Sequence, residues 1–258
     1  MLRIQEVMIE ITRTCNMACS HCIRGKSQKG VITKETIRNF FLNLEVEKIG
    51  NLVFTGGEPS LNPEVIQYTI DVLNEQGILF DGFYIATNGT QHSKTNEFLM
   101  MLIKLYSEAQ DVGMCSVLVS RDDYHLEAGI EGADDMYESL RFVRIEDGNS
   151  DYELFNDGFA FDNGNPLAIK TYDLGNVSIS IEESNGFYEI ENEEPLYLSV
   201  NGDIGIGCNF SYETFDSELI IANIDNIDSA SSFISELNNF ADNSDLNLEL
   251  DLESEEVA

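Results

Sequence analysis

The chain has 258 residues and is strongly acidic, with 47 Asp and Glu against 14 Lys and Arg, a net charge of −33, and no Lys or Arg after Lys170. This charge argues against binding to DNA or anionic membranes and permits a basic partner, although a general solubility trait explains it equally well. No apolar run approaches the roughly 18 residues that span a bilayer, and the N-terminus lacks a signal-peptide core. With five cysteines that do not suggest a disulfide framework, we expect a cytoplasmic protein.

Apolar runs typical of strands alternate with amphipathic segments typical of helices over residues 7–145. The expected strands are 7–12, 52–55, 83–87, 116–120 and 142–145, and the expected helices are 33–44, 62–76, 94–109 and 134–140. Thr33 and the Asn62-Pro63 pair mark two of the helix starts. Repeated βα units with apolar strands predict a parallel sheet with helices outside. We therefore expect an α/β fold, a partial (β/α)6 TIM-like barrel with a small C-terminal β-rich extension.

The pattern changes after residue 146. Residues 146–165 resemble a long loop, 177–181 could form a sixth strand, and 196–200 with 203–207 form a predicted hairpin around Asn201-Gly202. A helix is expected from Ser229 or Ser231 to Phe240, followed by an acidic segment expected to be flexible. The expected division is 1–185 for the barrel, 186–240 for the extension and 241–258 for the tail.

Three cysteines, Cys15, Cys19 and Cys22, follow the first strand with the spacing C-x3-C-x2-C. The loop is too polar for three buried, inert thiols. Three clustered thiolates can bind an iron–sulfur cluster or zinc. His21 could complete a zinc site, but the second Cys/His pair that usually builds such sites does not follow. The spacing favours a cluster and leaves zinc open.

A second motif, Leu-Val-Phe-Thr-Gly-Gly-Glu-Pro, occupies residues 52–59. Together the two motifs closely resemble the radical S-adenosylmethionine (SAM) superfamily, whose signature is C-x3-C-x2-C after the first strand and Gly-Gly-Glu-Pro after the second. The resemblance covers residues 5–145 well and the remainder weakly. Both motifs follow strand C-termini, where a barrel carries its reactive residues.

The resemblance implies specific roles for these residues. Cys15, Cys19 and Cys22 would bind a [4Fe–4S] cluster whose open iron binds the methionine moiety of SAM. Gly56, Gly57, Glu58 and Pro59 would lie along that moiety, with Glu58 pairing with its ammonium group. The backbone at His21 would meet the adenine. The candidates for the carboxylate and ribose contacts are Asn88, Ser120 and Asp122, and turn or cap roles explain these three about as well.

The resemblance also implies an activity. A donor such as flavodoxin or ferredoxin would reduce the cluster, and SAM would be cleaved to methionine and a 5′-deoxyadenosyl radical that abstracts hydrogen from a substrate. The protein would supply orientation and exclude water.

The predicted hairpin ends at Cys208 and resembles the C-terminal extension of peptide-modifying members. No cysteine follows Cys208, so it cannot supply an auxiliary cluster. It could donate a hydrogen atom as a catalytic residue, or be structural. A peptide or protein is the expected substrate, and a small molecule or nucleotide is the alternative. A non-catalytic metal-binding module is a third hypothesis, against which the intact Glu58 turn argues.

Overall fold

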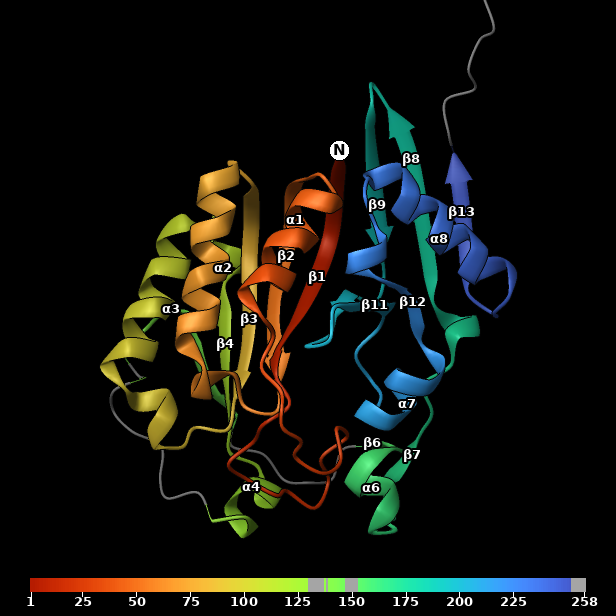
Figure 1. Ribbon diagram of the computed structural model, residues 1–258. Helices are drawn as coiled ribbons and strands as arrows, with labels where there is room; N and C mark the ends of the chain where they lie inside the picture. The colour runs from red at the N-terminus through yellow and green to blue at the C-terminus, as the bar shows by residue number, and fades with distance from the viewer. Residues whose placement is uncertain (130–136, 138, 147–152, 252–258) are drawn as a thin grey trace, which may run out of the picture.

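Parallel strands form the centre of the computed structural model, which describes residues 1–129, 137, 139–146 and 153–251. Five of them follow one another in sequence order across the sheet (Figure 1). These strands are β1 (Leu2–Thr12), β2 (Val46–Gly56), β3 (Leu79–Thr87), β4 (Ser116–Ser120) and β5 (Val143–Glu146). The structure confirms the expected α/β class: the central sheet is mostly parallel, and no closed barrel forms within the described residues, which is consistent with a partial TIM-like barrel.

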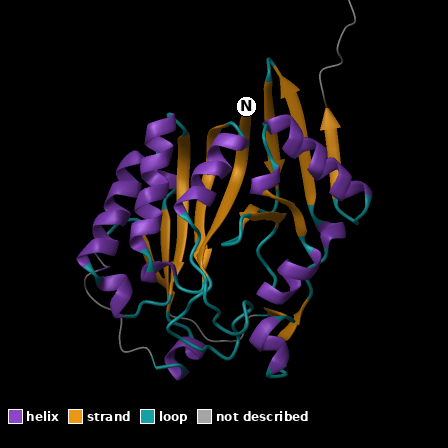
Figure 2. Cartoon of the chain, in the orientation of Figure 1, coloured by secondary structure: helices purple, strands orange, loops and turns teal. Residues whose placement is uncertain are grey.

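Three helices connect the first four strands and cover one face of the sheet (Figures 1 and 2). They are α1 (Lys34–Asn43), α2 (Pro63–Gln76) and α3 (Asn96–Glu108). As expected, Thr33 caps α1 by accepting a hydrogen bond from the Thr36 N–H at 3.0 Å. The α2 helix ends at Gly77, whose φ of 70° is the left-handed conformation that glycine adopts without strain.

The C-terminal strands extend the sheet from the other edge of β1. The strand β9 (Phe187–Asn192) pairs in parallel with the start of β1, and β10 (Leu196–Leu198) pairs in parallel further along it. The expected sixth strand exists as β8 (Ser178–Ser184), but it pairs with β9 and does not lie beside β5. The sheet therefore continues from β1, whose length of 11 residues gives one edge room for both β9 and β10.

The expected hairpin is present, with β10 antiparallel to β11 (Asp203–Ile206) and Leu196 opposite Ile206. Ser229, not Ser231, caps α8 (Ala230–Asp242) in a capping box. The expectation of a flexible tail is wrong for β13 (Asn247–Asp251), which pairs in parallel with β8 and follows the buried Leu246.

The remaining elements are α4 (Asp123–Glu127), β6 (Leu154–Phe155), α6 (Gly158–Asp162), β7 (Ala168–Lys170), α7 (Tyr212–Glu218) and β12 (Ile220–Asn223). The helix expected over 134–140 lies mostly outside the described residues.

Successive side chains of β1 point to opposite faces of the sheet and contribute to two separate apolar clusters. Val7, Ile9 and Ile11 belong to the main core, to which α1–α3 and α8 also contribute. Met8 belongs to a smaller cluster with Tyr197, Phe210 and Phe215 from the C-terminal region. No helix among the described residues is long and apolar enough to cross a membrane. The loops after β1, β2 and β3 gather at one end of the sheet, at the bottom of Figure 1, and position the site.

Candidate active site

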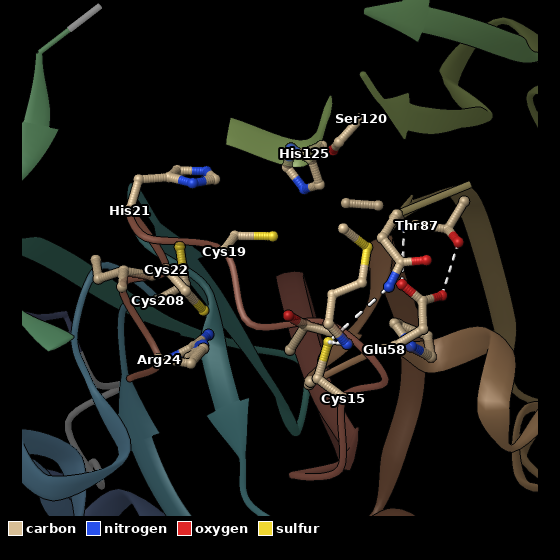
Figure 3. Close-up of a pocket in the computed structure, with 18 of the residues that line it drawn as sticks. Cys15, Cys19, His21, Cys22, Arg24, Glu58, Thr87, Ser120, His125 and Cys208 are labelled. Atoms are coloured by element: carbon tan, nitrogen blue, oxygen red, sulfur yellow. Dashed lines mark hydrogen bonds between the residues drawn. The ribbon is translucent and has the colours of Figure 1, made fainter. Parts of the chain in front are cut away.

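A cavity of about 520 Å³ opens at the C-terminal ends of the central strands (Figure 3). Eleven of the twelve predicted site residues line it: Cys15, Cys19, His21, Cys22, Gly56, Gly57, Glu58, Pro59, Asn88, Ser120 and Cys208. The twelfth, Asp122, is buried behind the lining residue His125. The fold therefore brings together residues that are up to 193 positions apart, between Cys15 and Cys208.

Backbone hydrogen bonds fold the cysteine loop tightly. The N–H of Cys22 donates to the carbonyl of Cys19 at 3.1 Å, and the Gly25 N–H donates to the Cys22 carbonyl at 3.1 Å. Ser27 holds the first cysteine, because its Oγ accepts from the Cys15 N–H at 2.9 Å. These turns bring the three thiol groups to one cavity although the loop has no regular secondary structure.

The glycine turn packs against the cysteine loop. The Gly57 N–H donates to the Thr12 carbonyl at 2.6 Å, and the Glu58 N–H donates to the Thr14 carbonyl at 3.0 Å. A Cβ atom at Gly56 would lie 2.1 Å from the Thr12 oxygen, and Gly56 has a φ of 142° that other residues rarely adopt. Both glycines are thus required for the two loops to approach, in addition to any role they have toward a bound methionine moiety.

Glu58 joins the loops after β2 and β3. Its carboxylate is 1% exposed and accepts hydrogen bonds from the Ser60 N–H at 3.0 Å, the Thr87 hydroxyl at 2.6 Å and the Asn88 N–H at 2.8 Å. Thr87 was not singled out from the sequence, although it ends an apolar strand, as reactive residues in such folds do. A carboxylate oxygen accepts more than one hydrogen bond, so Glu58 retains capacity toward a cationic ligand group.

Asn88 links the third strand to the cysteine loop. Its Nδ2 donates to Asn16 Oδ1 at 2.9 Å and lies 3.9 Å from the sulfur of Cys15. Its own Oδ1 accepts from the Thr90 N–H at 3.1 Å, a local turn contact. The side chain therefore has the turn role considered from the sequence and also lies at the cavity wall.

His21, Asp122 and His125 form a compact group on the opposite wall. One ligand atom from each lies within 4.8 Å of the others, a geometry that could hold a metal ion. The Asp122 carboxylate caps α4 through the His125 N–H at 3.0 Å and lies 2.6 Å from His125 Nδ1. Burial lowers the pKa of His21 to about 4, so its ring is neutral and stacks on Tyr124 at 4.3 Å between centroids. Asp122 caps the short helix α4 and His125 lies three residues further along, a spacing that could have drawn attention to His125.

The donor set fits an iron–sulfur cluster. Three thiols and no carboxylate come from one loop into a cavity whose lining is mainly apolar. Burial raises the pKa of all three thiols, that of Cys19 to about 12, so the metal-free loop holds protonated thiols at neutral pH. Binding iron must therefore release protons, and the positive charge of nearby Arg24 favours the thiolate of Cys22.

Two buried arginines connect this loop to the C-terminal region. Arg24 is 8% exposed, donates to the Phe210 carbonyl at 3.0 Å, and its guanidinium carbon lies about 5 Å from the rings of Phe210 and Tyr197. Arg13 binds both oxygens of Asp216 at 2.6 and 2.7 Å and the buried Glu10 at 3.2 Å. The residues that flank the cysteines thus also anchor α7.

Cys208 lines the same cavity as the three clustered cysteines. Its sulfur lies 3.9 Å from Glu194 Oε2, and burial raises its pKa to about 11, which keeps the thiol protonated at neutral pH. Cys115 is instead buried in the main core, as expected for a structural thiol.

Comparisons with known proteins agree with this geometry. The sequence matches the radical SAM superfamily over residues 9–143. The structure resembles that of BtrN in complex with AdoMet and 2-DOIA, with 19% identity, a TM-score of 0.56, and coverage of 95% of this chain and 90% of BtrN. It also matches Streptococcus suis SuiB bound to precursor peptide SuiA, with 14% identity, a TM-score of 0.49, and coverage of 90% and 64%. A search of curated proteins gives no significant match.

The similarity to BtrN shows a common fold that extends over nearly the whole chain. The superfamily match covers more than half of the residues and includes both motifs that line the cavity. The chain is therefore an enzyme of the radical SAM superfamily, which uses a [4Fe–4S] cluster and SAM as the two motifs predicted.

Proposed function

We propose that this enzyme modifies a basic peptide or protein. The observation that carries the proposal is the charge of the region that completes the cavity. Residues 121–258 contain 34 acidic and 4 basic side chains, and they supply Glu153 and Cys208 to the cavity wall. A surface of this charge attracts cationic polypeptides and speeds their association at low salt.

The cluster and SAM, when bound, supply a radical that removes a hydrogen atom from an unactivated C–H bond of the substrate. The protein would bind and orient these groups. Cys15, Cys19 and Cys22 would hold the cluster, while Glu58 and Asn88 would orient the methionine moiety of SAM. His21 and Ser120 line the part of the cavity that the adenosine moiety would occupy, with Asp122 supporting that wall through His125.

Cys208 would return a hydrogen atom to the substrate radical. Its S–H bond would break as a C–H bond forms on the product, and a thiyl radical would remain on the sulfur. One electron from the reduced electron-donor protein and one proton from water would restore the thiol. Two features support this role: Cys208 lines the cavity, and its raised pKa keeps the required S–H in place.

The experiment is anaerobic reconstitution followed by assay of substrate-dependent 5′-deoxyadenosine formation. Basic peptide fractions and a small-molecule filtrate of the same lysate are compared, with the Cys19→Ala variant as the blank. We expect stimulation by the peptide fraction that weakens as salt rises. Stimulation by the filtrate alone would contradict the peptide proposal and favour the small-molecule alternative, toward which the BtrN complex with 2-DOIA points.

The Cys208 role is tested in deuterated water, where the thiol carries deuterium. Wild-type product should gain one solvent-derived deuterium at carbon, and Cys208→Ser should lose it while still cleaving SAM. Cys115→Ser, which changes a thiol outside the cavity, is the matched control. Equal deuterium in the Cys208→Ser product would exclude Cys208 as the donor.

A further inference from the structure

The cysteine loop is unusual in this chain because it contains no carboxylate. Residues 11–34 contain none of the 47 acidic residues, yet they contain five of the 14 basic ones: Arg13, Arg24, Lys26, Lys29 and Lys34. The following loops continue the pattern at the same end of the sheet. The segment 57–63 has only the buried Glu58, and the segment 82–96 has no acidic residue.

Residues 26–32, which we name the lysine ribbon, fold back along the start of the cysteine loop. The Gln28 N–H donates to the Arg13 carbonyl at 3.0 Å, and Val31 forms an antiparallel bridge with Thr12. Ser27 Oγ lies within 3.3 Å of both the backbone N–H and the carbonyl of Cys15. The ribbon is therefore attached directly to the backbone of the first cysteine.

The ribbon presents its charges outward. Lys26 and Lys29 are exposed, and within the described part of the chain neither forms an ion pair. Acidic α7 approaches from one side, but its Asp216 is bound by Arg13. The two lysines are thus an exposed cationic feature in a protein of net charge −33.

The ribbon lies outside the lining of the large cavity. Neither Lys26 nor Lys29 lines that cavity, whereas Ser27 lines a separate small cavity of about 30 Å³, together with Cys15, Cys19 and Cys22. A protein bound to the ribbon would reach the cluster position from outside without blocking the cavity. Substrate and this partner could therefore be bound together.

We propose that the lysine ribbon is the docking site of an acidic one-electron carrier protein. The carrier would lose one electron and the oxidised cluster would gain it, with no bond made or broken. A chain of charge −33 repels an acidic protein over most of its surface, so a local cationic face next to the cluster would orient the encounter. The proposal rests on the radical SAM chemistry and is independent of the peptide substrate.

The test uses the reconstituted full-length enzyme and a reduced flavodoxin as the probe. Lys26→Gln/Lys29→Gln removes both ribbon charges. Arg3→Gln/Lys48→Gln removes two partly exposed, ion-paired charges near the N-terminal ends of β1 and β2, the ends away from the cysteine loop. Stopped-flow absorbance measures the rate of cluster reduction, and the fluorescence of oxidised flavodoxin measures binding without turnover.

We expect the ribbon variant to lose about tenfold in reduction rate and affinity at low salt, with the difference disappearing at high salt. The Arg3→Gln/Lys48→Gln variant should resemble the wild type. Equal rates for all three proteins, including no reduction of any of them by flavodoxin, would overturn the proposal, as would equal losses in both variants. Reduction and SAM cleavage with dithionite, a small reductant, report separately on the radical SAM chemistry on which docking rests, so a failure there is distinguishable from a failure of docking.

Discussion

The first 120 residues and the remaining 138 differ sharply in charge. Residues 1–120 carry 13 acidic and 10 basic side chains, for a net charge of −3, whereas residues 121–258 carry 34 and 4, for a net charge of −30. The near-neutral region supplies the cysteines, the glycine turn and Asn88, and the acidic region closes the cavity with Glu153 and Cys208. The acidic side chains are thus concentrated in the region that closes the cavity, whereas the region that holds the three thiols carries almost no net charge.

The two regions share β1 and two buried arginines. The strands β9 and β10 both pair with β1, and Arg13 and Arg24 extend from the cysteine loop into the acidic region. The comparison therefore separates the two sequence motifs, which lie in the first region, from cavity closure, which depends on the contacts between the regions.

The largest effect is expected from substitutions in the first region alone. Replacing Cys15, Cys19 or Cys22 with Ala should abolish the iron–sulfur cluster, because each removes a ligand from a set of three. Iron and sulfide analysis and the visible absorbance of anaerobically reconstituted protein measure the loss. Cys115→Ser and Cys208→Ser should keep about four irons per chain. A wild-type protein that binds zinc and no iron after reconstitution would refute the assignment of these ligands.

The second prediction concerns a substitution that removes a contact between the regions, the Arg13–Asp216 ion pair. Arg13→Met should lower the free energy of unfolding by about 3–5 kcal/mol, since it removes the ion-pair partner of the buried Glu10, which keeps only an uncharged donor, the Val200 N–H. The double variant Glu10→Gln/Arg13→Met should recover part of this loss, because no unpaired buried carboxylate remains at position 10. Urea unfolding measures both. Arg38→Met, which removes an exposed pair with Glu75, should leave the urea midpoint nearly unchanged, and an equal loss there would contradict the argument.

A smaller effect is expected at the glycine turn. Glu58→Gln should lower stability by about 1–3 kcal/mol, since an amide NH2 group would face donors at Thr87 or Asn88 in a buried site. It should also weaken SAM binding while the cluster remains, which the effect of SAM on the cluster's electron paramagnetic resonance spectrum measures. Unchanged SAM affinity in a destabilised Glu58→Gln protein would limit Glu58 to its structural role.

The smallest effect concerns pH and Cys208. Burial raises the pKa of this thiol from its ordinary value of 9.0 to about 11 in the folded protein. The folded state therefore holds the proton more tightly, so the thiol's contribution to stability is complete below pH 9 and is lost as pH rises toward 11. Site-resolved alkylation by iodoacetamide should show a midpoint near 11 in folded protein and near 9 in urea. A folded midpoint near 9 would mean that Cys208 is open to water.

Local patterns were enough to predict the first region. Strands of alternating or continuous apolar residues, Thr33 as a helix cap and Asn62-Pro63 as a helix start depend on neighbours in the sequence, and the structure contains each of them. The cysteine spacing and the Gly-Gly-Glu-Pro turn are also local, and both follow strands whose C-terminal ends must meet in a parallel sheet. Their convergence on one cavity therefore follows from the sequence.

Only the tertiary structure decided how the second region is arranged. Pairing of β9 and β10 with the free edge of β1, and of β13 with β8, joins segments that are more than 60 residues apart, and no short pattern specifies such partners. The same is true of the Arg13–Asp216 ion pair and of the aromatic rings around Arg24, which depend on where α7 packs. The sequence determined the chemistry because the motif residues lie close together in the chain, whereas long-range packing determined which side chains enclose it.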